Sequence, residues 1–311
     1  MALPEISIII PALNEETNIP IIFKRISNVL KKESFEVIFV DDGSTDSSFQ
    51  VIESLASADN RAKGISFSRN FGHQSALKAG LDAAAGNCAI SMDCDLEHPP
   101  EYLLQMIQFW REGADVVITQ RKVSTQLSLF KRLSSKVFYK ALRYISDIPV
   151  ESGTADFRLL DKKVITACKA ITENDLFWRG IIPWLGFKTK VISYEQAQRQ
   201  HGESKYTLSR MIKLSLAGIT SFSVRPLYLS LYLGATFSCL SICYLLYALF
   251  VKFFTNKSVS GWASVIASVL LIGGVQLLIL GVMGIYLGKL FIQTKGRPQY
   301  IVRETVGLST K

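Results

Sequence analysis

Two long stretches of this sequence carry no charged side chain, and they constrain the fold more than any other feature. The first runs from Pro226 to Val251 and the second from Ser258 to Gly288, which are 26 and 31 residues. A helix needs about 20 apolar residues to cross a bilayer. The alternative, two core helices of a soluble domain, is disfavoured because such helices are seldom so long and uncharged. We therefore expect two transmembrane helices, at about 227–251 and 262–288, joined into a hairpin.

The distribution of charge indicates the side of the membrane on which the rest of the chain lies. Residues 1–200 hold 24 basic and 24 acidic side chains, whereas residues 201–311 hold 11 basic and 2 acidic ones. The basic residues flank the hairpin, and the connector between its helices has only Lys252 and Lys257. Positive charge stays on the cytoplasmic side of a membrane. We therefore expect the N-terminal 225 residues on the cytoplasmic side of the inner (plasma) membrane of a cell, and a lipid surface rather than a nucleic acid as the basic region's partner.

Four segments follow from this organisation. Residues 206–222 have apolar side chains at helical spacing with basic residues near the other face, which suits either a helix lying in the membrane interface or an ordinary surface helix. The predicted segments are a cytosolic domain over 1–200, an interfacial segment over 201–225, the two transmembrane helices within 226–294, and a cytosolic C-terminal tail over 295–311.

The first 200 residues alternate between β-branched runs and stretches of helical periodicity. Runs such as ISIIIPAL and FEVIFVDDG read as strands, and NIPIIFKRISNVLKK reads as a helix. This alternation predicts an α/β, Rossmann-like fold with a mostly parallel sheet, whose ligands bind at the carboxyl ends of the strands. Neither GxGxxG nor GxxxxGK[ST] occurs, so neither a dinucleotide site nor a P-loop is supported.

Carboxylates follow two of the expected strands. Asp41 and Asp42 end one strand, where turn formation and helix capping explain one acidic residue but not two. Asp93 and Asp95 end another, and a bend there would let both reach one hard cation. Most such acidic pairs are solvated turns, so the DxD spacing alone is weak.

Two further segments contain both acidic and basic side chains. Asp156 and Arg158 stand in TADFRLL, and on this segment alone a surface ion pair is the favoured interpretation. Residues 199–205, RQHGESK, form a basic loop that suits either a phosphate or simply a membrane surface. The three histidines have no metal-ligand spacing.

Taken in order, the motifs of this chain resemble those of a known enzyme family. The matching segments are IIIPALNEE (Ile8–Glu16), VDDGSTD (Val40–Asp46), SRNFGHQSALKAGLDAAAG (Ser68–Gly86), MDCDLEHPPE (Met92–Glu101), ADFRLLDKKV (Ala155–Val164) and RQHGESKY (Arg199–Tyr206). The chain resembles the family-2 glycosyltransferases of GT-A fold. Within them it is similar to the bactoprenol (undecaprenyl-phosphate) glucosyltransferases and the related dolichyl-phosphate mannose synthases.

The resemblance implies a hexosyltransferase that moves a sugar, with inversion, from UDP-glucose to a polyprenyl phosphate for O-antigen or cell-envelope glycans, with Mg²⁺ or Mn²⁺ as cofactor. Mannosyl or aminoarabinosyl transfer and a non-catalytic, membrane-anchored nucleotide-sugar-binding protein are the alternatives. The roles that it implies are nucleotide binding by Pro11, Asn14, Glu16 and Asp42, metal binding by Asp93 and Asp95, catalysis by Asp95 and Asp156, and phosphate or acceptor binding by Arg158, Arg199, Ser204 and Lys205.

Glycines are dense in the second uncharged stretch. Gly284 and Gly288 form a GxxxG, and Gly281 falls on the same helical face. Small residues let helices approach closely in a membrane. This pattern predicts a homo-oligomer through the second transmembrane helix, and close packing of the two helices within one chain is the competing interpretation.

Overall fold

The computed structural model describes residues 4–121, 154–174, 176–194, 224–254 and 261–308. These residues fall into two compact units. One unit contains the sheet, its helices and the residues after 296, and the other contains the two long helices. Residues 201–223 of the expected interfacial segment lie outside the described residues.

Strands and helices alternate along the first 120 residues as predicted. The elements are β1 (Ile6–Ala12), α1 (Asn18–Val29), β2 (Phe35–Asp41), α2 (Ser48–Ala58), β3 (Ala62–Phe67), α3 (His73–Ala83), β4 (Cys88–Ser91), α4 (Tyr102–Arg111) and β5 (Val116–Arg121). Every residue of β1 and β2 is buried, which explains why the sequences of these strands are mostly apolar.

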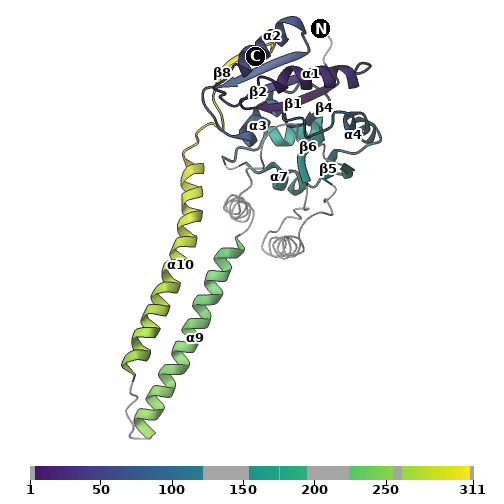
Figure 1. Ribbon diagram of the computed structural model, residues 1–311. Coiled ribbons are helices and arrows are strands. Elements are labelled where there is room, and N and C mark those ends of the chain that lie inside the picture. Colours follow the sequence, from purple (N-terminus) through teal and green to yellow (C-terminus); the bar gives the residue numbers. More distant parts are fainter. Residues whose placement is uncertain (1–3, 122–153, 175, 195–223, 255–260, 309–311) are drawn as a thin grey trace, which may run out of the picture. The chain divides into compact units, whose positions relative to one another are not determined.

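The sheet has eight strands in the order β7-β5-β6-β4-β1-β2-β3-β8, and Figure 1 labels β1, β2, β4, β5, β6 and β8 among them. Its remaining elements are β6 (Thr154–Asp161), α6 (Lys162–Lys169), α7 (Trp178–Trp184), β7 (Thr189–Tyr194) and β8 (Val302–Val306). Strand β1 runs parallel to β2 and β4, while β6 is antiparallel to β4 and β5, and β8 is antiparallel to β3. The fold is therefore GT-A-like α/β with a mostly parallel sheet.

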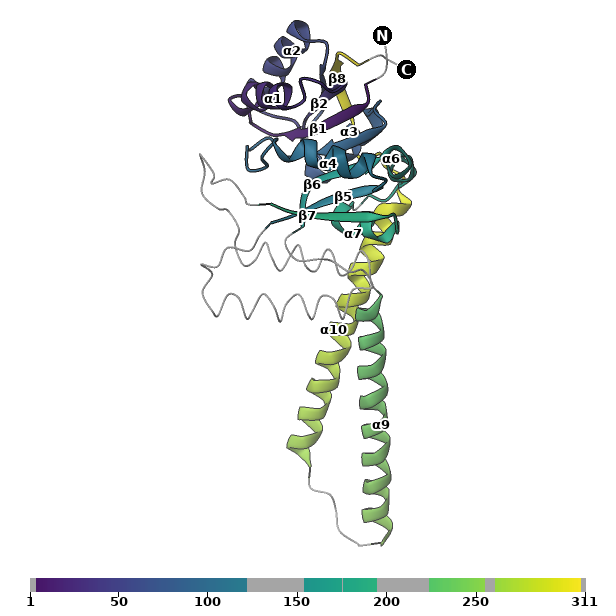
Figure 2. The same ribbon diagram turned by 90° about the vertical axis from the view of Figure 1, so that its right-hand side faces the viewer.

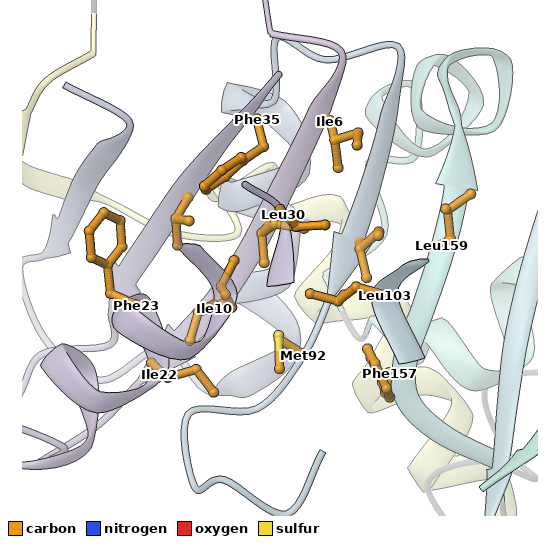
Figure 3. Packing of buried hydrophobic residues seen from close by; sticks show 14 of the residues in the cluster. Ile6, Ile10, Ile22, Phe23, Leu30, Phe35, Met92, Leu103, Phe157 and Leu159 are labelled. Atoms are coloured by element: carbon orange, nitrogen blue, oxygen red, sulfur yellow. The ribbon is translucent and has the colours of Figure 1, made fainter. Parts of the chain in front are cut away.

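Helices cover both faces of this sheet. The larger core packs α1, α2 and α4 against one face, and Figure 3 shows its side chains, among them Ile10, Phe23 and Leu103. On the other face, α3 packs its small residues Ala76 and Ala79 against Ile38 and Val40. This two-sided burial holds the strand ends, and the loops that follow them, in fixed positions.

The last strand comes from the segment that we expected to be a tail. Strand β8 pairs with β3, and Arg303 Nη2 donates a hydrogen bond of 3.0 Å to Ser66 Oγ. Tyr300, just before β8, stacks on Phe67 at 5.1 Å and donates a hydrogen bond of 2.9 Å to Asp82. Residues 302–306 therefore complete the sheet of the N-terminal domain.

Two long helices, α9 (Arg225–Phe254) and α10 (Trp262–Thr294), run side by side in the second unit (Figures 1 and 2). They cover the two stretches predicted to be helical. Within the described residues, one stretch, Leu271–Thr294, is long and apolar enough to cross a membrane, with a mean hydropathy of 2.0. The apolar part of α9, Ser230–Tyr244, is shorter, so this criterion supports one of the two expected spans.

Candidate active site

A cavity of about 430 Å³ lies where three parallel strands end. Because β1 is parallel to β2 and β4, the carboxyl ends of these strands meet at one edge of the sheet. The cavity is lined by Pro11, Ala12, Leu13, Glu15, Asp42, Asn70, Gly72, His73, Asp93, Cys94 and Asp95.

The loop after β1 is fastened to the loop after β2. Asn14, at a φ of 57°, accepts a hydrogen bond of 2.9 Å from the backbone N–H of Thr45. Glu16 accepts one of 3.0 Å from the backbone N–H of Ser47. Both predicted nucleotide-site residues thus join two loops and lie outside the cavity lining, whereas Glu15 between them lines the cavity. Burial raises the pKa of Glu15.

The two carboxylates that end β2 have different partners. Asp41 accepts hydrogen bonds from the backbone N–H of Ser44 (3.0 Å) and from Ser66 Oγ (2.9 Å), so it stabilises the turn. Asp42 accepts hydrogen bonds from the backbone N–H groups of Phe71 (2.7 Å) and Gly72 (3.0 Å). Asp42 therefore lines the cavity and also holds the loop that leads into α3, and burial raises its pKa.

Asp93 and Asp95 both line the cavity, as the bend predicted after β4 requires. The backbone N–H of Asp93 donates a hydrogen bond of 3.0 Å to Nδ1 of His98, whose buried ring stacks on Phe157 at 5.0 Å. Asp95 Oδ1 accepts a hydrogen bond of 3.1 Å from the backbone N–H of Glu97. Burial raises the pKa of Asp95, and the charge of Asp93 adds to this effect.

The carboxylate oxygens at this edge suit a hard divalent cation that also binds a phosphate ligand. Among the described residues, no group of three or more His, Cys, Asp or Glu side chains converges as a metal site. Mg²⁺, however, is commonly held by one or two carboxylates, with water and substrate phosphates as the other ligands. Asp93 and Asp95 fit that mode.

Asp156, in β6, forms a buried cluster with two arginines. Arg158 Nη2 donates a hydrogen bond of 2.6 Å to Asp156 Oδ1, and Arg179 Nη2 donates one of 2.8 Å to Oδ2. Burial alone raises the pKa of Asp156, but the charges of Arg158 and Arg179 outweigh it and hold that pKa well below the usual range of an aspartate. The carboxylate is therefore ionised and a poor proton acceptor near neutral pH.

His73, the first residue of α3, lies between the strand-end carboxylates and the cluster around Asp156. Its Nε2 atom is 3.6 Å from Asp93 Oδ1 and 3.8 Å from Asp156 Oδ2. One imidazole thus links the strand-end carboxylates to the cluster around Asp156. The lack of metal-ligand spacing gave no reason to select His73 from the sequence, and no motif pointed to Arg179.

The remaining predicted residues are Pro11, Arg158 and three residues of the basic loop. Pro11 lines the cavity. Arg158 is 3% exposed and also donates a hydrogen bond of 3.1 Å to the carbonyl oxygen of Trp178, so it lies behind Asp156 rather than at a surface. Arg199, Ser204 and Lys205 lie outside the described residues.

The mostly parallel GT-A-like sheet and the acidic cavity at its strand ends fit the class of the glycosyltransferases. The sequence model described as "Glycosyl transferase family 2" matches residues 7–168. The chain belongs to glycosyl transferase family 2, and it is a glycosyltransferase.

Relatives cover nearly the whole chain, α9 and α10 included. An uncharacterized glycosyltransferase, YkcC, of Bacillus subtilis (strain 168) is 42% identical, over 98% of this chain and 95% of the relative. A bactoprenol glucosyl transferase of Shigella phage SfII is 37% identical, over 97% of this chain and 98% of the relative. A prophage bactoprenol glucosyl transferase homolog of Escherichia coli (strain K12) is 36% identical, over 96% and 98%.

Solved structures are less similar. A glucosyl-3-phosphoglycerate synthase from Mycobacterium tuberculosis, in complex with Mn²⁺, UDP-glucose and phosphoglyceric acid, is 21% identical. It covers 70% of this chain and 78% of its own, with a TM-score of 0.46.

Proposed function

We propose that this enzyme transfers a hexose, glucose from UDP-glucose, to a polyprenyl phosphate such as undecaprenyl phosphate at the cytoplasmic face of a membrane. The observation that carries the proposal is the similarity, over 96–97% of this chain, to relatives named bactoprenol glucosyl transferase. Since the similarity includes the long apolar helices, it extends to the part that would meet a lipid substrate.

Chain topology supports a membrane hairpin. Strand β8 belongs to the same sheet as β1 to β7, so the chain must leave and re-enter on one side of any membrane. If Leu271–Thr294 crosses the bilayer, the chain must cross it a second time between β7 and β8. Helix α9 has 30 residues, about 45 Å at 1.5 Å per residue, which exceeds the roughly 30 Å of a hydrocarbon core. We therefore assign both crossings to α9 and α10, in a multi-pass inner-membrane protein.

In this proposal the acidic edge of the sheet binds the sugar donor, UDP-glucose. Pro11, Glu15 and Asp42 would contact the nucleoside, and Asp93 and Asp95 would hold a divalent cation, Mg²⁺ or Mn²⁺. Bound there, the cation would stabilise negative charge on the departing diphosphate. Asn14 and Glu16 would act by keeping the two loops of the nucleotide site together.

The transfer needs little help from a base. An oxygen of the acceptor phosphate forms a bond to the anomeric carbon of the sugar, while the bond from that carbon to the diphosphate breaks and its electron pair leaves with the nucleotide. A phosphate monoester is already largely ionised near neutral pH. The low pKa of Asp156 agrees with this, because the residue would orient groups near the acceptor rather than remove a proton.

The experiment that tests the proposal is turnover of radiolabelled UDP-glucose, GDP-mannose and UDP-N-acetylglucosamine by membranes that contain the protein and undecaprenyl phosphate. We expect label from UDP-glucose to enter the lipid fraction. Transfer from GDP-mannose alone would show that the donor is GDP-mannose and not UDP-glucose. Binding of nucleotide sugars without any lipid labelling would contradict lipid-phosphate transfer.

A further inference from the structure

The arginine that reaches the surface beside Asp156 is Arg179. Its Nε and Nη2 atoms both donate to Asp156 Oδ2, at 3.2 and 2.8 Å. One third of its side chain is exposed, 33%, whereas the side chains of Asp156 and Arg158 are 6% and 4% exposed. Solvent, or a ligand, therefore meets this cluster at Arg179.

The cluster carries more positive than negative charge. Asp156 and Arg158 form a buried ion pair whose charges cancel, so Arg179 gives the three side chains together one net positive charge. The neighbouring cavity is lined by carboxylates instead. An anion is favoured on the Arg179 side, and a cation is favoured on the cavity side, with His73 between them.

The backbone beside Arg179 is fixed. Trp178 is 1% exposed, its backbone N–H donates a hydrogen bond of 3.0 Å to Gln74 Oε1, and its Nε1 donates one of 3.0 Å to the backbone oxygen of Gln74. These contacts attach the start of α7 to the first turn of α3, which also carries His73. A guanidinium held by a rigid backbone and a carboxylate loses little freedom when it binds a ligand.

We propose that Arg179 binds the phosphate of the lipid acceptor and that Asp156 is a positioning residue that orients the Arg179 guanidinium. This inference rests on the proposed transfer to a polyprenyl phosphate. It assigns the phosphate contact to a residue that the sequence motifs did not select, and it gives Asp156 a role that requires no proton transfer.

The test is steady-state kinetics of the full-length protein in detergent, with farnesyl phosphate as acceptor and UDP-glucose as donor. Losing one charge-assisted hydrogen bond costs about 1.5–3 kcal/mol, so Arg179→Gln should raise the acceptor KM about 10- to 150-fold. The donor KM and the affinity for UDP should stay within about twofold, and Arg179→Lys should recover part of the loss because it keeps the charge.

Arg111→Gln is the matched control. Like Arg179, Arg111 forms ion pairs with carboxylates, but its partners, Glu5 and Glu33, lie at the other end of the strands. This variant should leave the acceptor KM unchanged. UDP binding by calorimetry confirms that each variant is folded.

A double-substitution cycle tests the role of Asp156. If Asp156 acts through Arg179, then Asp156→Asn should raise the acceptor KM by a far smaller factor in the Arg179→Gln background than in the wild type. If the two effects on the acceptor KM multiply in the double variant, Asp156 acts independently of Arg179. If Arg179→Gln instead raises the donor KM, that arginine lies at the diphosphate. Either result would overturn the inference while wild-type transfer still upheld the proposed function. Absence of wild-type transfer would instead remove the proposed function itself.

Discussion

At the scale of single residues, the cavity holds carboxylates that repel one another. Burial raises the pKa of Glu15, Asp42 and Asp95, and in Glu15 and Asp95 the neighbouring carboxylates add to it. A carboxyl group whose pKa is higher in the folded protein than in the unfolded chain favours folding in acid. That contribution falls as the pH rises through the unfolded pKa, about 4, to the raised folded value. At neutral pH the ionised carboxylates of the acidic edge therefore lower the stability of the fold, although the proposed function needs them.

We predict that Asp95→Asn separates stability from activity. In metal-free buffer at pH 7.5 the variant should melt at a higher temperature than the wild type. The difference should shrink as the pH falls, because protonation of Asp95 removes the same charge that the substitution removes. With Mg²⁺ or Mn²⁺ present, turnover should fall at least about 100-fold, the scale of losing one charge-stabilising group. Thermal unfolding and transfer assays on the full-length protein measure the two effects.

Asp59→Asn serves as the control, since Asp59 pairs with Arg61 at the end of α2 and its pKa is lowered. This substitution should reduce stability slightly and leave turnover intact. Full activity of Asp95→Asn in EDTA would exclude the assigned role.

The residues of the site were predictable to different degrees. Asp42, Asp93 and Asp95 could be found because each follows an apolar strand, and strand ends face the cavity. The sequence favours Asn14 and Glu16 over Glu15 as site residues. The direction of a side chain within an irregular loop depends on contacts such as that between Asn14 and Thr45, which no local pattern predicts. Arg179 reaches Asp156 from 23 positions away in the chain, and no local pattern encodes that contact.

At the scale of the elements, α3 lies unusually close to β1. A Cβ atom on Gly80 would stand 2.2 Å from Ile9 Cγ2, far below van der Waals contact. Gly80 thus allows the helix that presents His73 to pack against the sheet. Within the motif Ser68–Gly86, Gly80 is therefore explained by packing, whereas Asn70, Gly72 and His73 line the cavity.

We predict that Gly80→Ala destabilises the protein. Alanine gains about 1 kcal/mol of helix propensity, but overpacking costs about 1–3 kcal/mol, and the short contact favours the upper end. The expected net loss is about 1–2 kcal/mol, measurable by thermal or denaturant unfolding. In an Ile9→Ala background, which removes the clashing atom, the same substitution should be neutral or stabilising. A wild-type or higher melting temperature for Gly80→Ala alone would refute the packing argument.

The order of elements over residues 1–120 could be read from the sequence because apolar periodicity is local. Strands β6 and β8 could not, for different reasons. Strand β6 inserts between β4 and β5 in the antiparallel direction, which depends on long-range pairing. Strand β8 is exposed and short, VRETV, and follows a membrane-type helix, so nothing in its pattern indicates that it returns to β3.

At the scale of the whole molecule, the return of β8 to the sheet makes the membrane topology testable. We predict that residue 257, in the connector between α9 and α10, lies on the side opposite the catalytic domain. Lys257→Cys, in a chain whose Cys239 and Cys243 are replaced by serine, should react with a membrane-impermeant maleimide added outside intact cells. Thr305→Cys, at an exposed position of β8, should react only after the membrane is permeabilised. Protection of position 257 in intact cells would contradict the hairpin.

The glycine face of α10 predicts self-association. Gly284 and Gly288 are exposed in the structure, so they are available to a second chain. Gly284→Leu and Gly288→Leu should shift the protein in mild detergent towards monomer by native mass spectrometry, while Gly234→Leu in α9 should not. A monomeric wild type, or variants that keep the same oligomer, would show that these glycines form no interface between subunits.

The most direct test of the central claim, transfer of a hexose to a lipid phosphate, is mass spectrometry of the lipid product. Purified full-length protein, UDP-glucose, Mg²⁺ and undecaprenyl phosphate are incubated, and the lipids are extracted. The account predicts a new lipid with the mass of undecaprenyl phosphate plus one hexose, absent with undecaprenol as acceptor and strongly reduced in Asp95→Asn. Hexose transfer to undecaprenol, or no hexosyl lipid from protein that binds UDP, would contradict it.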